Sequence, residues 1–239
     1  GGAGNDTLDA GGGTDTLNGG TGNDFLIGGL GADRMDGGIG TDWALYNRLD
    51  ATAGVTINLL THIGSGGAAV GDRLYNIENV RGTKFNDVLT GDGLANELNG
   101  DLGNDTLNGG AGYEKIIGGA GHDILTDSDA ASAADQDIFR PGAGNDTITG
   151  DGNDVLDYRD ATSGVILDLS KTTIANLTNG TGGFAAGDVF SGINSAFGST
   201  FADAIVLGTS IGGVVYGFDG NDNLTLLGLF QRAIGGVGN

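Results

Sequence analysis

Five nine-residue units open the chain without a gap: GGAGNDTLD (1–9), AGGGTDTLN (10–18), GGTGNDFLI (19–27), GGLGADRMD (28–36) and GGIGTDWAL (37–45). Every unit has an apolar residue at its eighth position. Every unit also has an aspartate at its sixth position, which gives Asp6, Asp15, Asp24, Asp33 and Asp42. A strict period of nine predicts a repeat architecture, because equal units form equal local structures that can stack.

The composition supports a repeating backbone. The chain has 51 glycines among 239 residues, one proline and no cysteine, whereas glycine averages about 7% of ordinary proteins. Glycine takes positive φ angles without steric cost, so this content predicts either disorder or a backbone that turns at regular intervals. The strict period favours regular turns. The lack of cysteine excludes disulfides and is consistent with a secreted protein stabilised by metal.

Charge and hydropathy exclude two classes of partner. The formal net charge of −21 disfavours binding to nucleic-acid phosphates, and the fixed spacing of the aspartates indicates a cation as partner. We expect no membrane span, because no apolar run approaches the required length of about 20 residues. The chain begins without a signal-peptide pattern and ends in mid-unit at GGVGN, so we expect it to be part of a longer polypeptide.

The nine-residue register lapses and returns along the chain. A spacer at 46–81 shows strand-like alternation, with Val55, Ile57 and Leu59 on one side. Repeats resume at 82–126, and an acidic segment at 127–140 is expected to be a loop, with a short helix as the alternative. A degenerate second block follows at 141–239. The aspartate position is then occupied by Asp87, Asn96, Asp105, Glu114, Asp123, Asp146, Asp154, Asp203 and Asp222.

The two spacers match each other in sequence. Residues 46–59 match 158–169, and 71–87 match 187–203, with a six-residue insertion around 178–181 in the second copy. The chain is therefore expected to contain two copies of a larger unit. We predict a first block at 1–126, the linker at 127–140, and a second block at 141–239 with its spacer at 158–197.

The repeat chemistry points to calcium. The last three residues of a unit alternate out, in and out as a minimal strand, so two units make a coil of eighteen residues. Coils stack at about 4.8 Å, which places Asp6 over Asp24 on one edge. These carboxylates would repel without a cation, and with glycine carbonyls they offer the oxygen ligands that calcium prefers. The alternative is that the aspartates only solubilise or cap the turns.

The pattern G-G-x-G-x-D-x-U-x, with U apolar, resembles the RTX, or haemolysin-type, calcium-binding repeats. The resemblance implies an all-β, right-handed parallel β-roll of 18-residue coils with irregular spacers. It also implies that several Ca²⁺ ions are held by sixth-position carboxylates and by second- and fourth-position carbonyls. The implied ligands are Gly2, Gly4, Asp6, Gly11, Gly13, Asp15, Gly20, Gly22, Asp24, Gly29, Gly31, Asp33, Gly38, Gly40, Asp42, Asp87, Gly103, Asp105, Gly119, Gly121, Asp123, Gly142, Gly144, Asp146, Gly152, Asp154, Asp203 and Asp222.

The resemblance implies a non-catalytic calcium-binding module, exported from a Gram-negative bacterium by type I secretion and folded by calcium outside the cell. One alternative is an adhesin or surface-layer segment that binds like modules or a cell-surface polysaccharide. Another is part of a secreted enzyme. Against the enzyme, Ser210 in GTSIG lacks the following helix and histidine of a nucleophile elbow. His62 and His122 stand at variable positions and are expected to be exposed.

Overall fold

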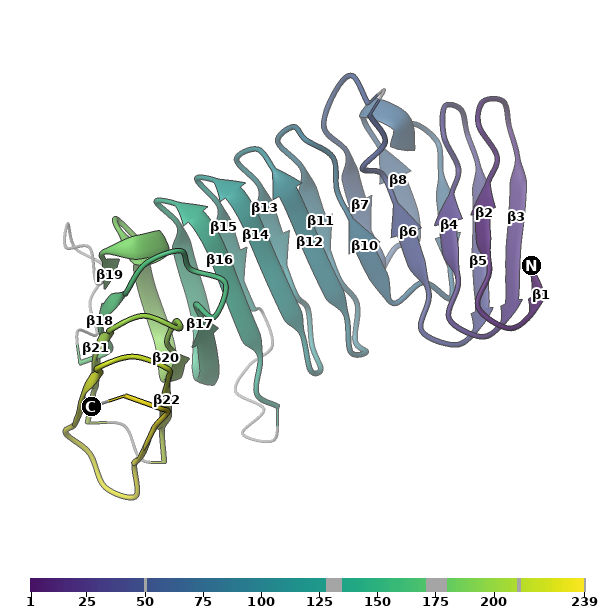
Figure 1. Ribbon diagram of the computed structural model, residues 1–239. Helices are drawn as coiled ribbons and strands as arrows, with labels where there is room; N and C mark the ends of the chain where they lie inside the picture. Colours follow the sequence, from purple (N-terminus) through teal and green to yellow (C-terminus); the bar gives the residue numbers. More distant parts are fainter. Residues whose placement is uncertain (50, 128–134, 171–179, 210–211, 239) are drawn as a thin grey trace. The chain divides into compact units, whose positions relative to one another are not determined.

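Short strands stacked in coils form the whole of the described structure (Figure 1). This computed structural model describes residues 1–49, 51–127, 135–170, 180–209 and 212–238. Within these residues no helix is long and apolar enough to cross a membrane. The chain divides into two compact units, Gly1–Glu114 and Lys115–Asn239. The boundary between these units lies inside the repeats at 82–126.

The regular elements of the first unit are almost all short β-strands joined by turns. Its strands are β1 (Gly2–Ala3), β2 (Thr7–Asp9), β3 (Thr16–Thr21), β4 (Phe25–Ile27), β5 (Arg34–Ile39), β6 (Trp43–Leu45), β7 (Thr56–Asn58), β8 (Ile63–Ser65), β9 (Arg73–Tyr75), β10 (Asn79–Arg81), β11 (Val88–Thr90), β12 (Glu97–Leu102) and β13 (Thr106–Asn108). A 3₁₀-helix, η1 (Gly67–Ala69), is the one helical element among the described residues of the first unit.

Successive coils pair in parallel with a displacement of eighteen residues. Thr7 pairs with Phe25, Thr16 with Arg34, and Phe25 with Trp43. The purple strands of Figure 1 show this stacking at the start of the chain. The predicted all-β, parallel solenoid of 18-residue coils is thus confirmed in the first unit.

One inward side chain from each short strand builds the core of the first unit. Strand β4 has an exposed, a buried and a half-buried residue in succession, which is the expected out, in and out pattern. Full burial of a large apolar side chain contributes about 1.5–3 kcal/mol. The inward column on one face is Leu8, Leu26, Ala44, Val80 and Leu98, and the column on the other face includes Leu17, Met35, Leu74, Ile57, Leu89 and Leu107.

The first spacer inserts extra strands into one face of the solenoid. Strand β9 pairs in parallel with β5, β7 pairs in parallel with β11, and the antiparallel strand β8 joins β7 to β9. On the other face, β6 pairs directly with β10. The expected strands of the spacer are therefore present, and Val55, Ile57 and Leu59 are all buried.

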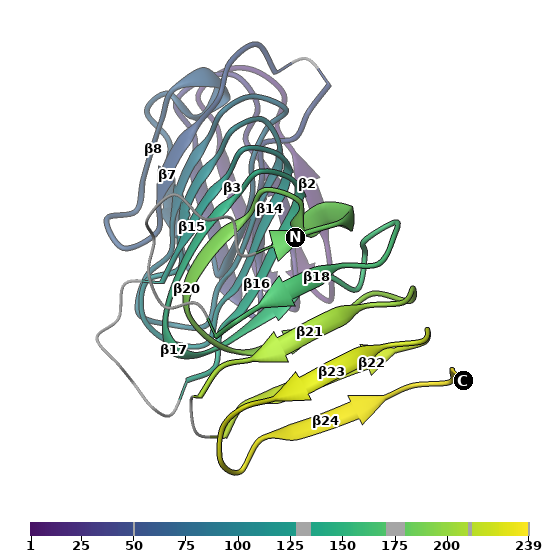
Figure 2. The ribbon, with the colours of Figure 1, turned by 90° about the vertical axis from the view of Figure 1, so that its left-hand side faces the viewer.

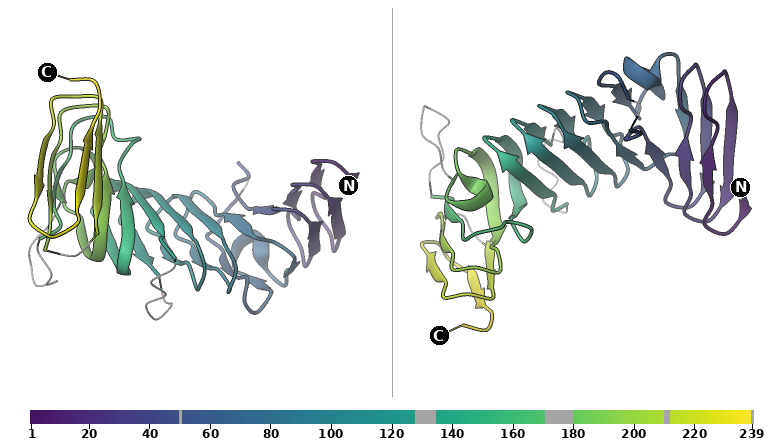
Figure 3. Two further views of the ribbon diagram at one scale, coloured as in Figure 1. Left: turned by 90° about the horizontal axis from the view of Figure 1, so that it is seen from below. Right: turned by 45° about the horizontal axis from the view of Figure 1, so that its top comes forward.

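The second unit has the same architecture. Figure 2 brings β18, β21 and β23 to the viewer, and Figure 3 gives two further directions. Its elements are β14 (Lys115–Gly121), β15 (Ile124–Thr126), β16 (Ile138–Gly144), β17 (Thr147–Asp157), β18 (Ile166–Asp168), β19 (Gly180–Thr181), η2 (Gly183–Ala185), β20 (Val189–Phe197), β21 (Ala204–Leu207), β22 (Val214–Phe218), β23 (Asn223–Leu226) and β24 (Arg232–Gly235).

The second spacer folds like the first. Strand β20 pairs in parallel with β17, β18 pairs in parallel with β21, and β19 is antiparallel to β18. The sequence match between the spacers therefore corresponds to a structural match. The six-residue insertion falls largely on residues outside the described structure, as do Ser210 and the segment 128–134 where a short helix was the alternative. Strand β16 begins at Ile138, so the last three residues of the expected linker are strand.

Candidate metal centre

A ladder of carboxylates runs along the turns of the first unit. The backbone amide of Asp6 donates a hydrogen bond to Oδ1 of Asp24 at 2.7 Å. Asp15 donates in the same way to Asp33 at 2.8 Å, and Asp24 to Asp42 at 2.7 Å. Asp24, Asp33 and Asp42 thus each use one carboxylate oxygen to cap the backbone of the preceding coil. The expected stacking of aspartates eighteen residues apart is present.

The other carboxylate oxygen has a different environment. At several of the described aspartates, Oδ2 is buried and accepts no hydrogen bond from the described residues. A buried polar atom in that state is costly unless another group neutralises it. Oδ1 therefore caps the backbone, whereas Oδ2 is available to bind another group. These aspartates include Asp6, Asp15, Asp24, Asp33, Asp42 and Asp146.

Glycine lets the turns approach these oxygens closely. Gly22 has a φ of +120°, and a Cβ on it would collide with the carbonyl oxygen of Gly4 in the neighbouring coil. A Cβ on Gly19 would collide with both Oδ2 of Asp24 and the carbonyl oxygen of Gly37. Carboxylate and carbonyl oxygens from adjacent coils therefore meet at the first position of the repeat, a role of that glycine which the sequence analysis missed.

The second- and fourth-position glycines predicted as ligands have the backbone that such turns need. Their φ angles lie between 88° and 153°, a region that side-chain-bearing residues rarely adopt. Gly40 is the one member of the predicted set outside this region. The others are Gly2, Gly4, Gly11, Gly13, Gly20, Gly22, Gly29, Gly31, Gly38, Gly103, Gly119, Gly121, Gly142, Gly144 and Gly152.

The ladder of carboxylates continues across the first spacer. There the sequence separation between hydrogen-bonded residues rises from eighteen to thirty-nine and thirty-six. The amide of Asp33 donates to Oδ1 of Asp72 at 2.9 Å, and that of Asp42 donates to Oε2 of Glu78 at 2.7 Å. Glu78 thus occupies the position that aspartate has in the regular repeats. Asp72 was missed because it lies thirty-nine residues after Asp33, although its match with Asp188 in the aligned spacers was a usable signal.

Later repeats of the first unit retain parts of the ladder. The amide of Asp87 donates to Oδ1 of Asp105 at 2.8 Å. Asn96 replaces aspartate and donates from Nδ2 to the carbonyl of Glu78 at 2.8 Å. An amide in place of the carboxylate removes one negative charge from this edge.

The second unit carries a comparable ladder with irregular spacing. The amide of Asp123 donates to Oδ1 of Asp146, and that of Asp146 donates to Oδ1 of Asp188, both at 2.8 Å. Asp203 donates to Oδ1 of Asp222 at 3.0 Å. Both oxygens of Asp154 accept backbone amides, from residue 137 at 3.2 Å and from residue 151 at 2.8 Å.

Burial raises the pKa of several ladder carboxyls. Burial, reinforced by repulsion from Asp188 and Asp123, raises the pKa of Asp146 to about 7. Burial is also the main cause that raises the pKa of Asp154 to about 6 and the pKa of Asp42 above its usual range. These groups need either a proton or a cation to offset the loss of water.

The ladder offers carboxylate and carbonyl oxygens as its main ligand atoms. Stacked carboxylates and carbonyls suit a hard cation such as calcium, whereas zinc prefers histidine and cysteine. The two histidines are exposed, as expected. His62 stacks on Tyr75 at 5.3 Å between ring centroids, and Nδ1 of His122 accepts the amide of Asn145 at 2.9 Å.

Comparison with known families identifies the repeats. The family model described as the RTX calcium-binding nonapeptide repeat matches four times, at residues 1–26, 9–44, 90–125 and 134–160. These matches leave out residues 45–89 and 161–239, which contain most of both spacers. No curated protein matches the chain significantly.

Proposed function

Because the chain carries the calcium-binding nonapeptide repeats of the RTX family, we propose that it is a non-catalytic module that several calcium ions fold and stabilise. The ions are held between coils by Oδ2 of the sixth-position aspartates and by the carbonyls of the second- and fourth-position glycines. In the first coils this assigns Gly2, Gly4 and Asp6 to one half of a site, with Gly20, Gly22 and Asp24 facing them.

The buried Oδ2 atoms are the observation that carries this proposal. Oδ1 of Asp24 is engaged by a backbone amide, whereas its Oδ2 has no hydrogen-bond partner in the described part of the chain. The Asp24 side chain is also fully buried. Turn capping alone explains Oδ1 but leaves Oδ2 unneutralised, so a cation accounts for the second oxygen. Calcium accepts about six to eight oxygen ligands, which a pair of turns can supply.

Calcium binding and folding are one event under this proposal. The net charge of −21 and the thin coils oppose folding, since ordering each residue costs about 1–2 kcal/mol. A metal site that exists only in the folded state contributes its binding free energy to folding. Extracellular calcium modules bind at about 10⁻⁴ to 10⁻³ M. The chain would therefore stay unfolded in a Gram-negative cytoplasm and fold after type I secretion, supporting the longer polypeptide to which it belongs.

Far-UV circular dichroism during a calcium titration tests the proposal. The calcium-free chain should show a largely unstructured spectrum at pH 7.5, and millimolar calcium should produce a strand spectrum. Magnesium at the same concentration is the control, because its demand for octahedral geometry at about 2.1 Å suits this ligand set poorly. A strand spectrum in excess chelator that calcium leaves unchanged would contradict coupled folding.

A groove on the first unit supports a second candidate function, attachment to a neutral polysaccharide. Phe25 and Trp43 stand side by side on adjacent strands, with ring centroids 6.4 Å apart, and Phe25 is 42% exposed. They line an open groove of about 360 Å³ with Arg81, Glu97 and Asn99 among its polar residues. Aromatic faces pack on sugar rings, while amide and guanidinium groups bind hydroxyls, and the acidic chain disfavours polyanionic glycans.

Binding of the calcium-loaded chain to neutral polysaccharides, measured by calorimetry, tests this candidate. Trp43→Ala should abolish any binding, and Phe201→Ala, which removes an exposed aromatic residue in the other unit, should leave it intact. Equal binding by both variants, or no binding by the unmodified chain, would reject the groove as a glycan site.

A further inference from the structure

Four buried carboxylates in and just after the two spacers accept hydrogen bonds from hydroxyl groups of the chain. We name Asp72, Asp87, Asp188 and Asp203 the hydroxyl-capped carboxylates. We propose that they do not bind calcium, because Tyr46, Thr83, Tyr158 and Ser199 take the place of the ion through their hydroxyls and, at Thr83 and Ser199, through their backbone amides as well. This inference rests on the proposed function, and it removes Asp87 and Asp203 from the ligands implied by the sequence.

Asp72 has a partner for each carboxylate oxygen. Oδ1 accepts the amide of Asp33 at 2.9 Å, as in the rest of the ladder. Oδ2 accepts the hydroxyl of Tyr46 at 2.8 Å. Asp72 is fully buried and Tyr46 is 3% exposed. The oxygen that lacks a partner in Asp24 and Asp33 is therefore satisfied in Asp72 by a neutral donor.

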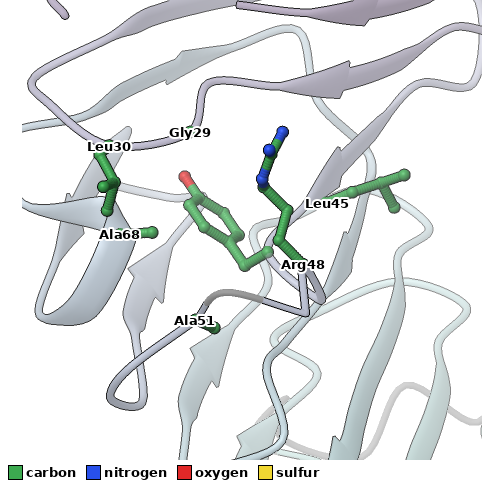
Figure 4. A pocket seen from close by; sticks show the side chains of 7 residues that line it. Gly29, Leu30, Leu45, Arg48, Ala51 and Ala68 are labelled. Atoms are coloured by element: carbon green, nitrogen blue, oxygen red, sulfur yellow. The ribbon is translucent and has the colours of Figure 1, made fainter. Parts of the chain in front are cut away.

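The surroundings of Tyr46 leave little room for an ion. Tyr46 lines a hollow of about 10 Å³ together with Gly29, Leu30 and Ala68, which is about the room of one water molecule. Figure 4 shows this hollow, with Arg48 extending toward the turn at Gly29. Its lining is apolar apart from the Tyr46 hydroxyl and Arg48, whose guanidinium is paired with Asp9.

Asp87 is satisfied by a different hydroxyl in its own turn. Oδ1 accepts the amide of Val55 at 2.7 Å and the hydroxyl of Thr83 at 3.0 Å. Oδ2 accepts the amide of Thr83 at 2.6 Å. The hydroxyl of Thr83 in turn accepts the amide of Phe85 at 3.0 Å. This network closes around the carboxylate and leaves neither oxygen without a partner.

The second unit repeats both arrangements. The hydroxyl of Tyr158 donates to Oδ2 of Asp188 at 2.6 Å, and the amide of Asp146 donates to its Oδ1 at 2.8 Å. The hydroxyl of Ser199 donates to Oδ1 of Asp203 at 2.8 Å, and the amide of Ser199 donates to its Oδ2 at 2.7 Å. Tyrosine and Ser/Thr hydroxyls thus reach equivalent carboxylates in both units. An accidental contact in one unit does not explain this recurrence.

The turns before these carboxylates also lack the glycine pair that presents carbonyl ligands. Asp87 follows GTKFN, and Asp203 follows GSTFA, so a hydroxyl residue and a phenylalanine replace the second and fourth glycines. Before Asp72 the chain forms η1, and the carbonyl of Ala69 accepts the amide of Asp72 at 3.2 Å. The four matches to the RTX repeat exclude all four hydroxyl-capped carboxylates, which agrees with a different kind of turn.

The spacers would thus end one row of calcium sites and begin the next without placing unneutralised charge in the core. On the edge that carries Asp15 and Asp33, the row of stacked carboxylates ends at Asp72. The amide of Asp72 donates to the carbonyl of Ala69, within the same turn. Val55 then stands at the aspartate position, and its amide binds Asp87. The hydroxyls allow a carboxylate to keep its ladder hydrogen bond where no ion is bound.

Counting bound calcium by equilibrium dialysis and atomic absorption tests the inference. The Asp87→Asn and Asp203→Asn variants should bind as many ions as the unmodified chain. Their calcium midpoints should stay within about twofold of its midpoint, whereas a loss of about 1.4 kcal/mol in binding would shift the midpoint tenfold. Asp24→Asn is the matched ladder variant and should lose at least one ion. Loss of an ion in Asp87→Asn or Asp203→Asn would overturn this inference alone, whereas an unmodified chain that binds no calcium overturns the proposed function.

A second pair of variants keeps the test decisive if an aspartate variant does not fold. Thr83→Ala removes the hydroxyl, and Thr83→Ser keeps it, as Ser199 does in the second unit. Thr83→Ala should lower the urea midpoint equally in saturating and in limiting calcium, with an unchanged ion count, and Thr83→Ser should behave like the unmodified chain. A gain or loss of bound calcium in Thr83→Ala would overturn the proposal.

Discussion

Oδ1 of Asp24 accepts the backbone amide of Asp6, one coil away, at 2.7 Å, while Oδ2 of the same carboxylate is buried without a hydrogen-bond partner in the described structure. Asp24→Asn separates these two roles, because asparagine keeps one carbonyl-type oxygen and loses the charge. A hydrogen bond to a charged group contributes about 1.5–3 kcal/mol. Loss of a charged calcium ligand of comparable strength should raise the calcium midpoint about tenfold or more. Asp222→Asn, at a half-exposed position near the end of the array, should have a smaller effect.

Circular dichroism titrations of these two variants in parallel provide the measurement. Equal shifts in Asp24→Asn and Asp222→Asn would show that the best-preserved repeats do not hold the strongest sites.

Gly4 and Gly22 occupy the same repeat position in successive coils but face different neighbours. Both have positive φ angles, of 105° and 120°, so an alanine at either position costs about 1–3 kcal/mol in backbone strain. A Cβ on Gly22 would also collide with the carbonyl of Gly4, whereas a Cβ on Gly4 would have no neighbour within 4 Å. Gly22→Ala should therefore destabilise the calcium-loaded chain more than Gly4→Ala does. Thermal unfolding of the pair checks this order, which the reverse ranking would contradict.

Leu26 lies in the middle of one inward column and is fully buried. Each coil contributes only one side chain per face, so a cavity there cannot be filled by a second layer. Leu26→Ala should lower the free energy of unfolding by about 2–5 kcal/mol. Leu8→Ala, at the half-exposed start of the same column, is the control and should cost less. Urea unfolding in saturating calcium measures both. A cost at Leu26 no larger than at Leu8 would mean that the column does not support the coils.

The regular part of this fold could be predicted from the sequence because one local pattern encodes both period and burial. The spacing of Asp6, Asp15 and Asp24 gave the eighteen-residue coil and the i to i+18 stacking, both of which the structure confirms. The same pattern could not reveal that Oδ1 and Oδ2 have different partners. That division depends on the distance between coils, which no single repeat contains.

The spacers show where sequence reasoning stops. Their mutual match was visible, but the meander of β7, β8 and β9 depends on tertiary pairing across thirty-two and thirty-nine residues. The contact between Tyr46 and Asp72 joins residues twenty-six apart and follows no repeat register. Asp87 fitted the register and was assigned to calcium for that reason, although the replacement of two glycines by Thr83 and Phe85 was a signal for a different turn.

Acid should favour folding of the calcium-free chain. The pKa of Asp146 is raised to about 7 and that of Asp188 to about 6, in both cases mainly by burial, whereas an unfolded aspartate titrates near about 3.9. Between these values the folded chain binds more protons than the unfolded chain. The free energy of unfolding in the absence of calcium therefore falls as the pH rises from about 4 to about 7. Asp157 acts in the opposite sense below that window: although burial opposes it, hydrogen bonds from Arg159 and Arg140 hold its pKa below the usual range.

Under the proposed function, calcium would take the place of the proton on Asp146 in the same window. Because the ligands must be deprotonated, calcium affinity should rise with pH where the stability of the calcium-free chain falls. The measurement is circular dichroism of calcium-depleted protein between pH 4 and 8, with a calcium titration at each pH. Asp146→Asn should flatten the dependence of calcium-free folding on pH near pH 7, because it removes the carboxyl whose pKa is raised to about 7. A calcium-free chain that gains strand structure as the pH rises from 4 to 7 would contradict the raised pKa values of Asp146 and Asp188.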